Sequence, residues 1–216
     1  MAELRVRYHQ QLEAIEAKVS QLFALVAEGL AAATEALLAG DRGVVAVLTE
    51  RERSIDALYR EAEDLVNQQF APQAPVATDL RFLLSVLRIV PELERSHDLV
   101  VHIARRADPT VASDLSPRAR GLVQRMGGLG ADMWRQTADA WYRRDAGAAA
   151  ALAQHDDEMD GLHAALVAEL GGGAVPLPVV MEMTLVARFY ERLGDHAVNI
   201  ARRVVYLAGQ QRAAVE

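Results

Sequence analysis

The chain has 216 residues and a formal net charge of −7; 51% of its residues are hydrophobic, 5% are aromatic and none is cysteine. The absence of cysteine excludes disulfides, thiolate metal sites and cysteine nucleophiles, and it fits a reducing compartment. The acidic balance and the lack of a dominant basic stripe argue against nucleic-acid binding. No stretch approaches the roughly 18 uninterrupted apolar residues of a membrane span. The N-terminus lacks the apolar core of a signal peptide. We therefore expect a cytoplasmic protein.

Apolar residues recur at helical spacing along almost the whole chain, and only a few breaks rich in glycine, proline or aspartate interrupt them. Long helices with short connections are typical of antiparallel bundles, so we expect an all-α fold. The six predicted helices cover residues 4–39, 41–70, 75–107, 117–143, 146–170 and 177–209.

Two stretches of the chain are copies of one another. Residues 191–203 resemble residues 94–106 at a constant offset of 97, and residues 159–163 resemble 55–59 at an offset of 104. The offsets differ by seven residues, which fits a deletion between the second and third helices of the second half, and together they indicate an internal duplication. Each half alone would have a thin core. We therefore predict two similar three-helix units, 1–110 and 115–216, packed side by side.

An acidic residue is followed four positions later by an aspartate once on each of four predicted helices. This spacing places both carboxylates on one helix face. Two such pairs on adjacent helices would direct four carboxylates at one point, which is unfavourable unless a cation compensates. Such oxygen ligands suit Mg²⁺, Ca²⁺, Mn²⁺ or iron, and zinc less well. The candidate metal ligands are Glu52, Asp56, Glu94, Asp98, Asp156, Asp160, Glu191 and Asp195.

A plainer interpretation of these pairs is a set of solvated acidic faces. Random placement of 30 acidic residues would itself give roughly two such pairs. The matching register of the pairs in the two halves favours a site. His102 and Asn199 lie eight residues after Glu94 and Glu191, and they are either further ligands, partners of ligands, or hydrogen-bonded residues between helices. We expect core or interface positions for Trp134 and Trp141. The arginines near the repeats are expected to balance carboxylates at the surface: Arg95, Arg105, Arg106, Arg192, Arg202 and Arg203.

No catalytic motif stands out in the sequence. The triple glycine at 171–173 is not followed by the Lys-Ser/Thr of a phosphate-binding loop. A ferritin-like di-metal oxidase would need a Glu-x-x-His on each of two helices. Only Glu94 with His97 fits this pattern, and Gly194 stands at the position equivalent to His97. A metal-free structural scaffold is the remaining alternative.

The sequence resembles the PhoU family of phosphate-signalling regulators, and in particular its actinobacterial members. The resemblance covers essentially the whole chain. It rests on the motif Glu191-Arg192-x-x-Asp195-His196-x-x-Asn199-Ile200-Ala201 with the preceding Arg188-Phe189-Tyr190, on the segments 75–81 and 156–163, and on Tyr8-His9-Gln10-Gln11-Leu12.

The resemblance implies two side-by-side three-helix bundles and a cytoplasmic, non-enzymatic negative regulator of phosphate uptake. Its implied partners are the phosphate-sensing histidine kinase and the ATPase subunit of the high-affinity phosphate ABC transporter, and it makes a homodimer plausible. Some family members hold iron or zinc on their acidic pairs, which implies the two sets of four carboxylates named above. The first set departs from the family pattern, with Leu99 in place of the usual histidine and His102 in place of asparagine.

Overall fold

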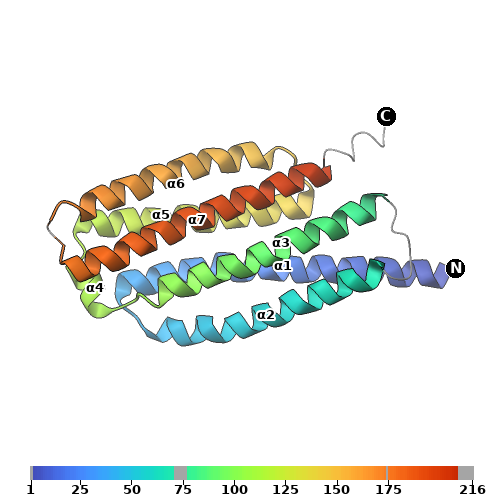
Figure 1. The fold of residues 1–216 in the computed structure, drawn as a ribbon, viewed down its shortest axis with the longest axis horizontal. Coiled ribbons are helices and arrows are strands. Elements are labelled where there is room, and N and C mark those ends of the chain that lie inside the picture. Colours follow the sequence, from blue (N-terminus) through green and yellow to red (C-terminus); the bar gives the residue numbers. More distant parts are fainter. Residues whose placement is uncertain (1, 71–76, 174, 209–216) are drawn as a thin grey trace.

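The computed structural model describes residues 2–70, 77–173 and 175–208, and the regular structure within them is helical. Six long helices run along the longest axis of the molecule, and one short helix lies at its end (Figure 1). Their bounds are α1 Ala2–Ala39, α2 Gly43–Phe70, α3 Ala77–Ala104, α4 Pro109–Asp114, α5 Pro117–Arg143, α6 Ala148–Leu170 and α7 Leu177–Ala208.

The helices form two three-helix bundles that lie side by side. Helices α1, α2 and α3 pack together, and so do α5, α6 and α7. The two halves meet where α1 packs against α5 and α3 packs against α7, while α2 and α6 lie on opposite flanks (Figure 1). The predicted all-α fold of two side-by-side bundles is confirmed. The boundaries 1–110 and 115–216 stay a prediction.

The first and second helices of each half are connected by turns of the same design. Gly40 ends α1 with a φ of 70°, and Arg144 ends α5 with a φ of 54°. The following aspartate then accepts a hydrogen bond from the backbone N–H two residues later, at 2.8 Å in both halves. Glycine is needed in the first turn because a Cβ there would meet the Pro109 Cα at 2.7 Å.

The connection between the halves differs from the sequence prediction. We expected residues 107–117 to be a break, but they contain α4. Asp108 caps it by accepting a hydrogen bond from the Thr110 N–H at 2.8 Å, and Pro109 occupies its first turn. The same combination of a cap and a proline, Ser116 with Pro117, begins α5. As a result α3 ends at Ala104 rather than at 107. The predicted start at 75 and end at 209 lie outside the described residues.

Large aromatic side chains fill the interface between the halves. Trp134 of α5 packs on Phe23 of α1, with ring centroids 6.3 Å apart, and Trp141 packs on Phe82 of α3 at 5.8 Å. Both tryptophans are fully buried, which confirms their predicted place in the core. The Tyr190 and Thr34 hydroxyl groups form a hydrogen bond of 2.8 Å across the same interface.

Among the described residues, helix α1 alone contains a long apolar window. Its residues Val6–Ala39 are long and apolar enough to cross a membrane by length and composition alone. However, 56% of the relevant window is buried inside the protein, where α1 contacts α2, α3 and α5. Packing in a core selects the same composition, so this one helix is weak evidence for a membrane span.

Candidate functional site: two carboxylate clusters beside the seam

The eight candidate ligands fall into two groups of four. The first cluster consists of Glu52 and Asp56 on α2 with Glu94 and Asp98 on α3. The second cluster consists of Asp156 and Asp160 on α6 with Glu191 and Asp195 on α7. In each half the two contributing helices pack against one another. The duplication therefore places one cluster on each side of the molecule, in the groove between the outer helix and its neighbour.

The side chains of the second cluster are electrostatically coupled. Burial, together with the negative charges of Asp195, Asp160 and Glu191, raises the pKa of Asp156 to about 6. Burial also raises the pKa of Glu191, while its ion-pair partner Arg188 opposes the shift. The Glu191 Oε2 atom is buried without a hydrogen-bond partner. Ionising all four carboxylates is therefore unfavourable in the absence of a compensating cation.

A glycine makes room for the second cluster. A Cβ on Gly194 would lie 2.8 Å from the Asp156 Oδ1 atom, 3.6 Å from the Met133 Cε atom and 3.7 Å from the Met159 Cγ atom. The Asp156 carboxylate consequently lies against the bare backbone of α7. Any side chain at position 194 would displace this carboxylate from its place beside Glu191 and Asp195.

The first cluster is coupled in the same way, and like the second it has an arginine beside one of its glutamates. Burial, followed by the charges of Asp98 and Asp56, raises the pKa of Glu94. Burial also raises the pKa of Asp98, although the nearby His102 and Arg105 oppose this shift. The Arg105 Nη2 atom lies 3.7 Å from the Glu52 Oε2 atom. The first cluster thus has a fixed positive charge between α2 and α3.

The equivalent of Gly194 in the first half is His97, whose imidazole is buried. The His97 Cδ2 atom lies 3.9 Å from the position of a Cβ on Gly29 of α1. By the offset of 104 that relates Asp41 to Asp145, Gly29 of the first half is equivalent to Met133 of the second. The first half therefore packs a large α3 side chain on a small α1 residue, and the second half packs a large α5 side chain on a small α7 residue.

Neither nitrogen of His97 has a hydrogen-bond partner among the described residues. Burial and the positive charge of Arg51 together lower the pKa of His97 to about 4, although Asp56 opposes the shift. This histidine is therefore neutral at pH 7 and acts as a packing residue of the first half.

The chemistry of the eight side chains fits a hard divalent cation, because they offer carboxylate oxygens and carry excess negative charge. The side chains do not converge as they stand. Among the described residues, no group of three histidine, aspartate or glutamate side chains is close enough to hold a metal ion. Metal binding by either cluster would require the carboxylates to change rotamer, and it stays a prediction.

His102 and Asn199, the less certain candidate ligands, face the seam between α3 and α7. The imidazole of His102 stacks on Phe189 of α7, with ring centroids 5.5 Å apart. Asn199 lies beside residues of α3 in a pocket at the same seam, and its Oδ1 atom accepts a hydrogen bond from Arg202 at 3.4 Å. Their contacts match the interpretation of polar residues between helices.

The sequence reasoning missed a polar chain at the centre of this seam. The Ser96 Oγ atom of α3 lies 2.9 Å from the Nδ1 atom of His196 on α7, and the His196 Nε2 atom lies 3.5 Å from the Glu92 Oε1 atom. The pKa of His196 is lowered by burial, with Glu92 opposing the shift. No spacing rule in the sequence singles out Ser96 or Glu92.

The arginines beside the repeats only partly follow the prediction that they balance carboxylates. Arg95, Arg105 and Arg106 each form an ion pair, with Glu92, Glu52 and Glu182 respectively. Arg203 forms none with a described residue, and Arg202 contacts the amide of Asn199 instead. The part of α7 around Arg202 and Arg203 therefore carries an excess of positive charge, which the sequence pattern did not predict.

Comparison with known proteins places this geometry in a family. The model of the PhoU domain matches the chain twice, over residues 19–107 and 123–204. The "Phosphate-specific transport system accessory protein PhoU homolog 2" of Mycobacterium tuberculosis is 32% identical over 210 residues, which are 95% of this chain and 98% of that protein.

Two crystal structures of PhoU proteins are similar to this structure. The PhoU structure from Pseudomonas aeruginosa has a TM-score of 0.86 at 29% identity and covers 94% of this chain and 99% of its own. The phosphate transport system regulatory protein PhoU from Streptococcus pneumoniae has a TM-score of 0.81 at 25% identity and covers 93% and 96%. The two repeats, the full-length match and the shared fold together show that the chain belongs to the PhoU family.

Proposed function

We propose that this protein is a cytoplasmic accessory regulator of phosphate-specific transport that restrains phosphate uptake and the phosphate-starvation response. The observation that carries the proposal is the match of both halves to the PhoU domain, together with near-complete coverage of relatives named as accessory proteins of the phosphate-specific transport system. Its partners would be the ATPase subunit of the phosphate ABC transporter and the phosphate-sensing histidine kinase. It would act by docking, without catalysis.

An exposed apolar stripe on α7 supports a docking role. Leu177, Met181 and Leu185 follow one another at intervals of four and are 71%, 63% and 45% exposed. This spacing places the three side chains on one helix face. Contiguous apolar surface of this kind marks protein interaction sites. We assign this stripe to the transporter ATPase; a second copy of the chain is the competing occupant.

The test is recovery of partners by the tagged protein from phosphate-replete cells of the source organism. We expect the wild-type chain to recover the transporter ATPase and the sensor kinase. Met181→Asp should lose the ATPase, because it places a charge in the apolar stripe. Val47→Asp is the matched control, since Val47 is 52% exposed on α2 and lies away from α7. Recovery of neither partner by the wild-type protein would contradict the docking proposal, and a dimer lost only in Met181→Asp would reassign the stripe.

We further propose that the second cluster is the better cation site. Asp156, Glu191 and Asp195 would supply the oxygens, and a bound Mg²⁺, Mn²⁺ or iron ion would neutralise charges that now repel one another; zinc suits this oxygen set less well. A ligand that binds only the folded state raises the melting temperature. We expect Mn²⁺ to raise it for the wild type and for Asp98→Asn, but not for Asp156→Asn. No response from any of the three proteins would favour a metal-free scaffold, and equal rises in all three would place the bound ion outside the two clusters.

No described contact favours the di-metal oxidase alternative. His97, the one histidine in a Glu-x-x-His pattern, is buried beside Gly29 of α1, and Gly194 occupies its place in the second half. The Glu-x-x-His pattern therefore supplies the oxidase with one imidazole, and that imidazole is packed into the core.

A further inference from the structure

A pocket with a volume of about 700 Å³ opens at the seam between the two halves, between α3 and α7. Four arginines line it, Arg88 and Arg95 from α3 and Arg202 and Arg203 from α7, together with a single acidic residue, Glu92. Its volume lies within the range of about 300–1,000 Å³ that is usual for small-molecule sites. A local excess of positive charge on a protein with a net charge of −7 is unusual.

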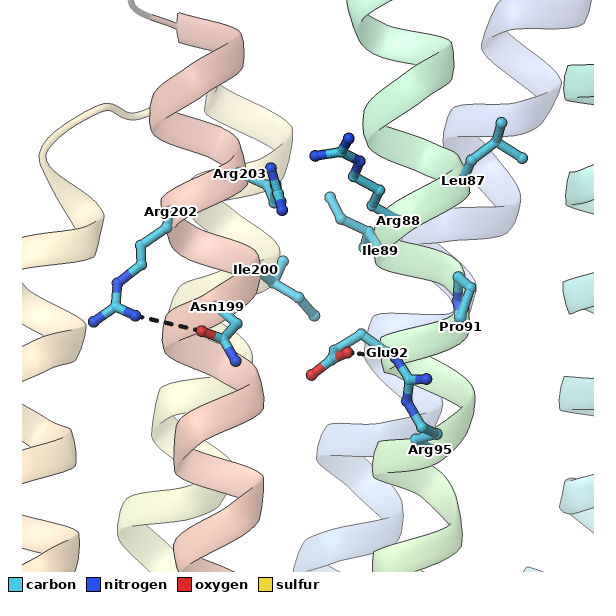
Figure 2. A pocket seen from close by; sticks show the side chains of 10 residues that line it. All are labelled: Leu87, Arg88, Ile89, Pro91, Glu92, Arg95, Asn199, Ile200, Arg202 and Arg203. Carbon is cyan, nitrogen blue, oxygen red and sulfur yellow. Dashed lines mark hydrogen bonds and ion pairs between the residues drawn. The ribbon is translucent and has the colours of Figure 1, made fainter.

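The charges in the pocket are unevenly compensated. Arg95 is paired with Glu92 at 2.7 Å, and Arg202 donates to Asn199 at 3.4 Å. Within the part of the chain that the structure describes, no acidic side chain lies within ion-pair distance of Arg88 or Arg203. Figure 2 shows these two side chains extending toward one another from α3 and α7. Two guanidinium groups that face each other repel unless an anion lies between them.

At the other end of the seam between α3 and α7, Arg106 is paired with the acidic residue Glu182, and we call this the compensated end. Helices α3 and α7 are antiparallel, because Glu92 of α3 lines a pocket with Asn199 of α7 while His102 of α3 stacks on Phe189 of α7. By the offset of 97, Glu92 of the first half is equivalent to Phe189 of the second, and His102 is equivalent to Asn199. The contact at one end of the seam is thus the repeat equivalent of the contact at the other end. The two ends of the seam are therefore equivalent positions of the duplicated structure.

At the compensated end an aromatic ring lies in the seam, and the arginine beside it has an acidic partner. Phe189 stacks on His102, and the guanidinium carbon of Arg106 lies 4.8 Å above the ring centroid of Phe189. The Arg106 Nε atom also lies 2.9 Å from the Glu182 Oε2 atom. Its equivalent at the pocket end is Arg203, and the residue equivalent to Glu182 is the buried Ser85. The pocket end has thus lost both the aromatic plug and the carboxylate.

We propose that this pocket binds a small anion that carries a phosphate group, held between Arg88 of the first half and Arg203 of the second. Guanidinium groups bind phosphate oxygens through paired, charge-assisted hydrogen bonds. The volume accepts inorganic phosphate, pyrophosphate or a nucleoside monophosphate, which share this chemistry. A bound anion would link the two halves at the seam. The inference goes beyond the proposed function and does not depend on it, because it concerns the purified chain alone.

Isothermal titration calorimetry tests the proposal, with sodium phosphate, sodium pyrophosphate and AMP titrated at constant ionic strength into the full-length protein. We expect saturable binding of at least one of the three, and the compound that binds most tightly identifies the source of the phosphate group. Arg88→Gln and Arg203→Gln should each weaken binding by roughly tenfold or more, since each removes charged hydrogen bonds. Arg135→Gln is the matched control, because it removes the same charge at a site away from the pocket. Arg135 is paired with Asp132 of its own helix α5.

A second variant closes the pocket instead of discharging it. Glu92→Phe combined with Asn199→His introduces the residues that fill the equivalent end of the seam, and it should abolish binding while all four arginines remain. Saturable binding that survives this double variant would place the anion elsewhere. The proposal is overturned if none of the three compounds binds at millimolar concentration, or if Arg203→Gln and Arg135→Gln weaken binding equally, which would indicate non-specific attraction.

Discussion

The two carboxylate clusters occupy equivalent places in the duplicated fold, yet they solve one packing problem in opposite ways. In the first half His97 of α3 fills the space beside Gly29 of α1, whereas in the second half Met133 of α5 fills the space beside Gly194 of α7. The exchange of a large for a small residue on facing helices keeps the packing volume similar. The two halves therefore share one helix arrangement, but the side chains next to their carboxylate clusters differ.

This difference affects the chemistry of the clusters. Asp156 lies against the uncovered backbone at Gly194 and stays close to three other carboxylates. The equivalent residue of the first half is Glu52, which is paired with Arg105, and His97 stands where the second half has Gly194. Each cluster therefore has one arginine, Arg105 in the first and Arg188 in the second, but the largest pKa shift among the eight carboxylates is that of Asp156 in the second cluster. A duplicated motif in the sequence does not imply two equal sites.

The most severe way to break the comparison is to place the residue of the first half into the second. Gly194→His would drive an imidazole into the space of the Asp156 carboxylate and of Met133. We expect a loss of at least about 3 kcal/mol in the free energy of unfolding, at the upper end of the range for overpacked cores. Urea denaturation measures it. Adding Met133→Gly should restore part of the loss, and a double variant no more stable than Gly194→His would contradict the proposed exchange.

The next effect concerns the buried imidazole of the first half. Because the pKa of His97 is lowered to about 4 in the folded protein, the unfolded chain binds more protons between pH 6.5 and 4. Stability therefore falls as the pH falls through this window, and the contribution of His97 is about 2 kcal/mol at pH 5. His97→Leu should remove this loss.

The check is to compare urea denaturation of the wild type and His97→Leu at pH 7 and pH 5, with chelator present. The raised pKa values of Asp156 and Glu94 act in the opposite direction over the same range, so only the difference between the two proteins isolates His97. We also expect His97→Leu to be at least as stable as the wild type at pH 7, because neither imidazole nitrogen is hydrogen-bonded. Parallel pH profiles for the two proteins would show that His97 is not the responsible group.

The architecture could be predicted because helical periodicity is visible over short stretches of sequence. The similarity between the two halves then indicated that one three-helix unit occurs twice. Helix ends were predictable where glycine, aspartate and proline mark them, as at Gly40 and Asp145. Helix α4 was missed because its six residues are too few to show a periodic pattern, although Asp108 and Pro109 carry a cap and a first-turn proline.

The sites were predictable only as far as helical spacing reaches. A spacing of four correctly grouped Glu191 with Asp195 and Glu94 with Asp98. The sequence could not show that Asn199 lies beside α3 or that Arg203 has no acidic partner among the described residues, because both facts depend on how α3 and α7 cross. The contrast between the filled and the open end of the seam becomes visible only after the repeat offset is combined with the helix contacts.

A milder change sharpens the electrostatic comparison of the clusters. Asp195→Asn removes the largest charge effect on Asp156, so the pKa of Asp156 should fall from about 6 but stay above its ordinary value, since burial is the main cause of the shift. Asp98→Asn should likewise lower the pKa of Glu94 in the first cluster. Titration of the carboxyl carbons by NMR reads out both. An unchanged pKa of Asp156 in Asp195→Asn would mean that the four carboxylates of the second cluster do not act together.

The smallest expected effect tests the cation of the first cluster. Arg105→Gln removes a partly exposed ion pair with Glu52, and such pairs contribute less than about 1 kcal/mol, so stability should hardly change. The pKa of Asp98 should nevertheless rise, because Arg105 opposes the effect of burial on it. Arg202→Gln, the equivalent change in the second half, should leave the pKa of Asp156 where it is, because Arg202 contacts Asn199. If the first cluster then gains the response to Mn²⁺ expected of the second, Arg105 and not the exchange of Gly194 for His97 is what limits cation binding there.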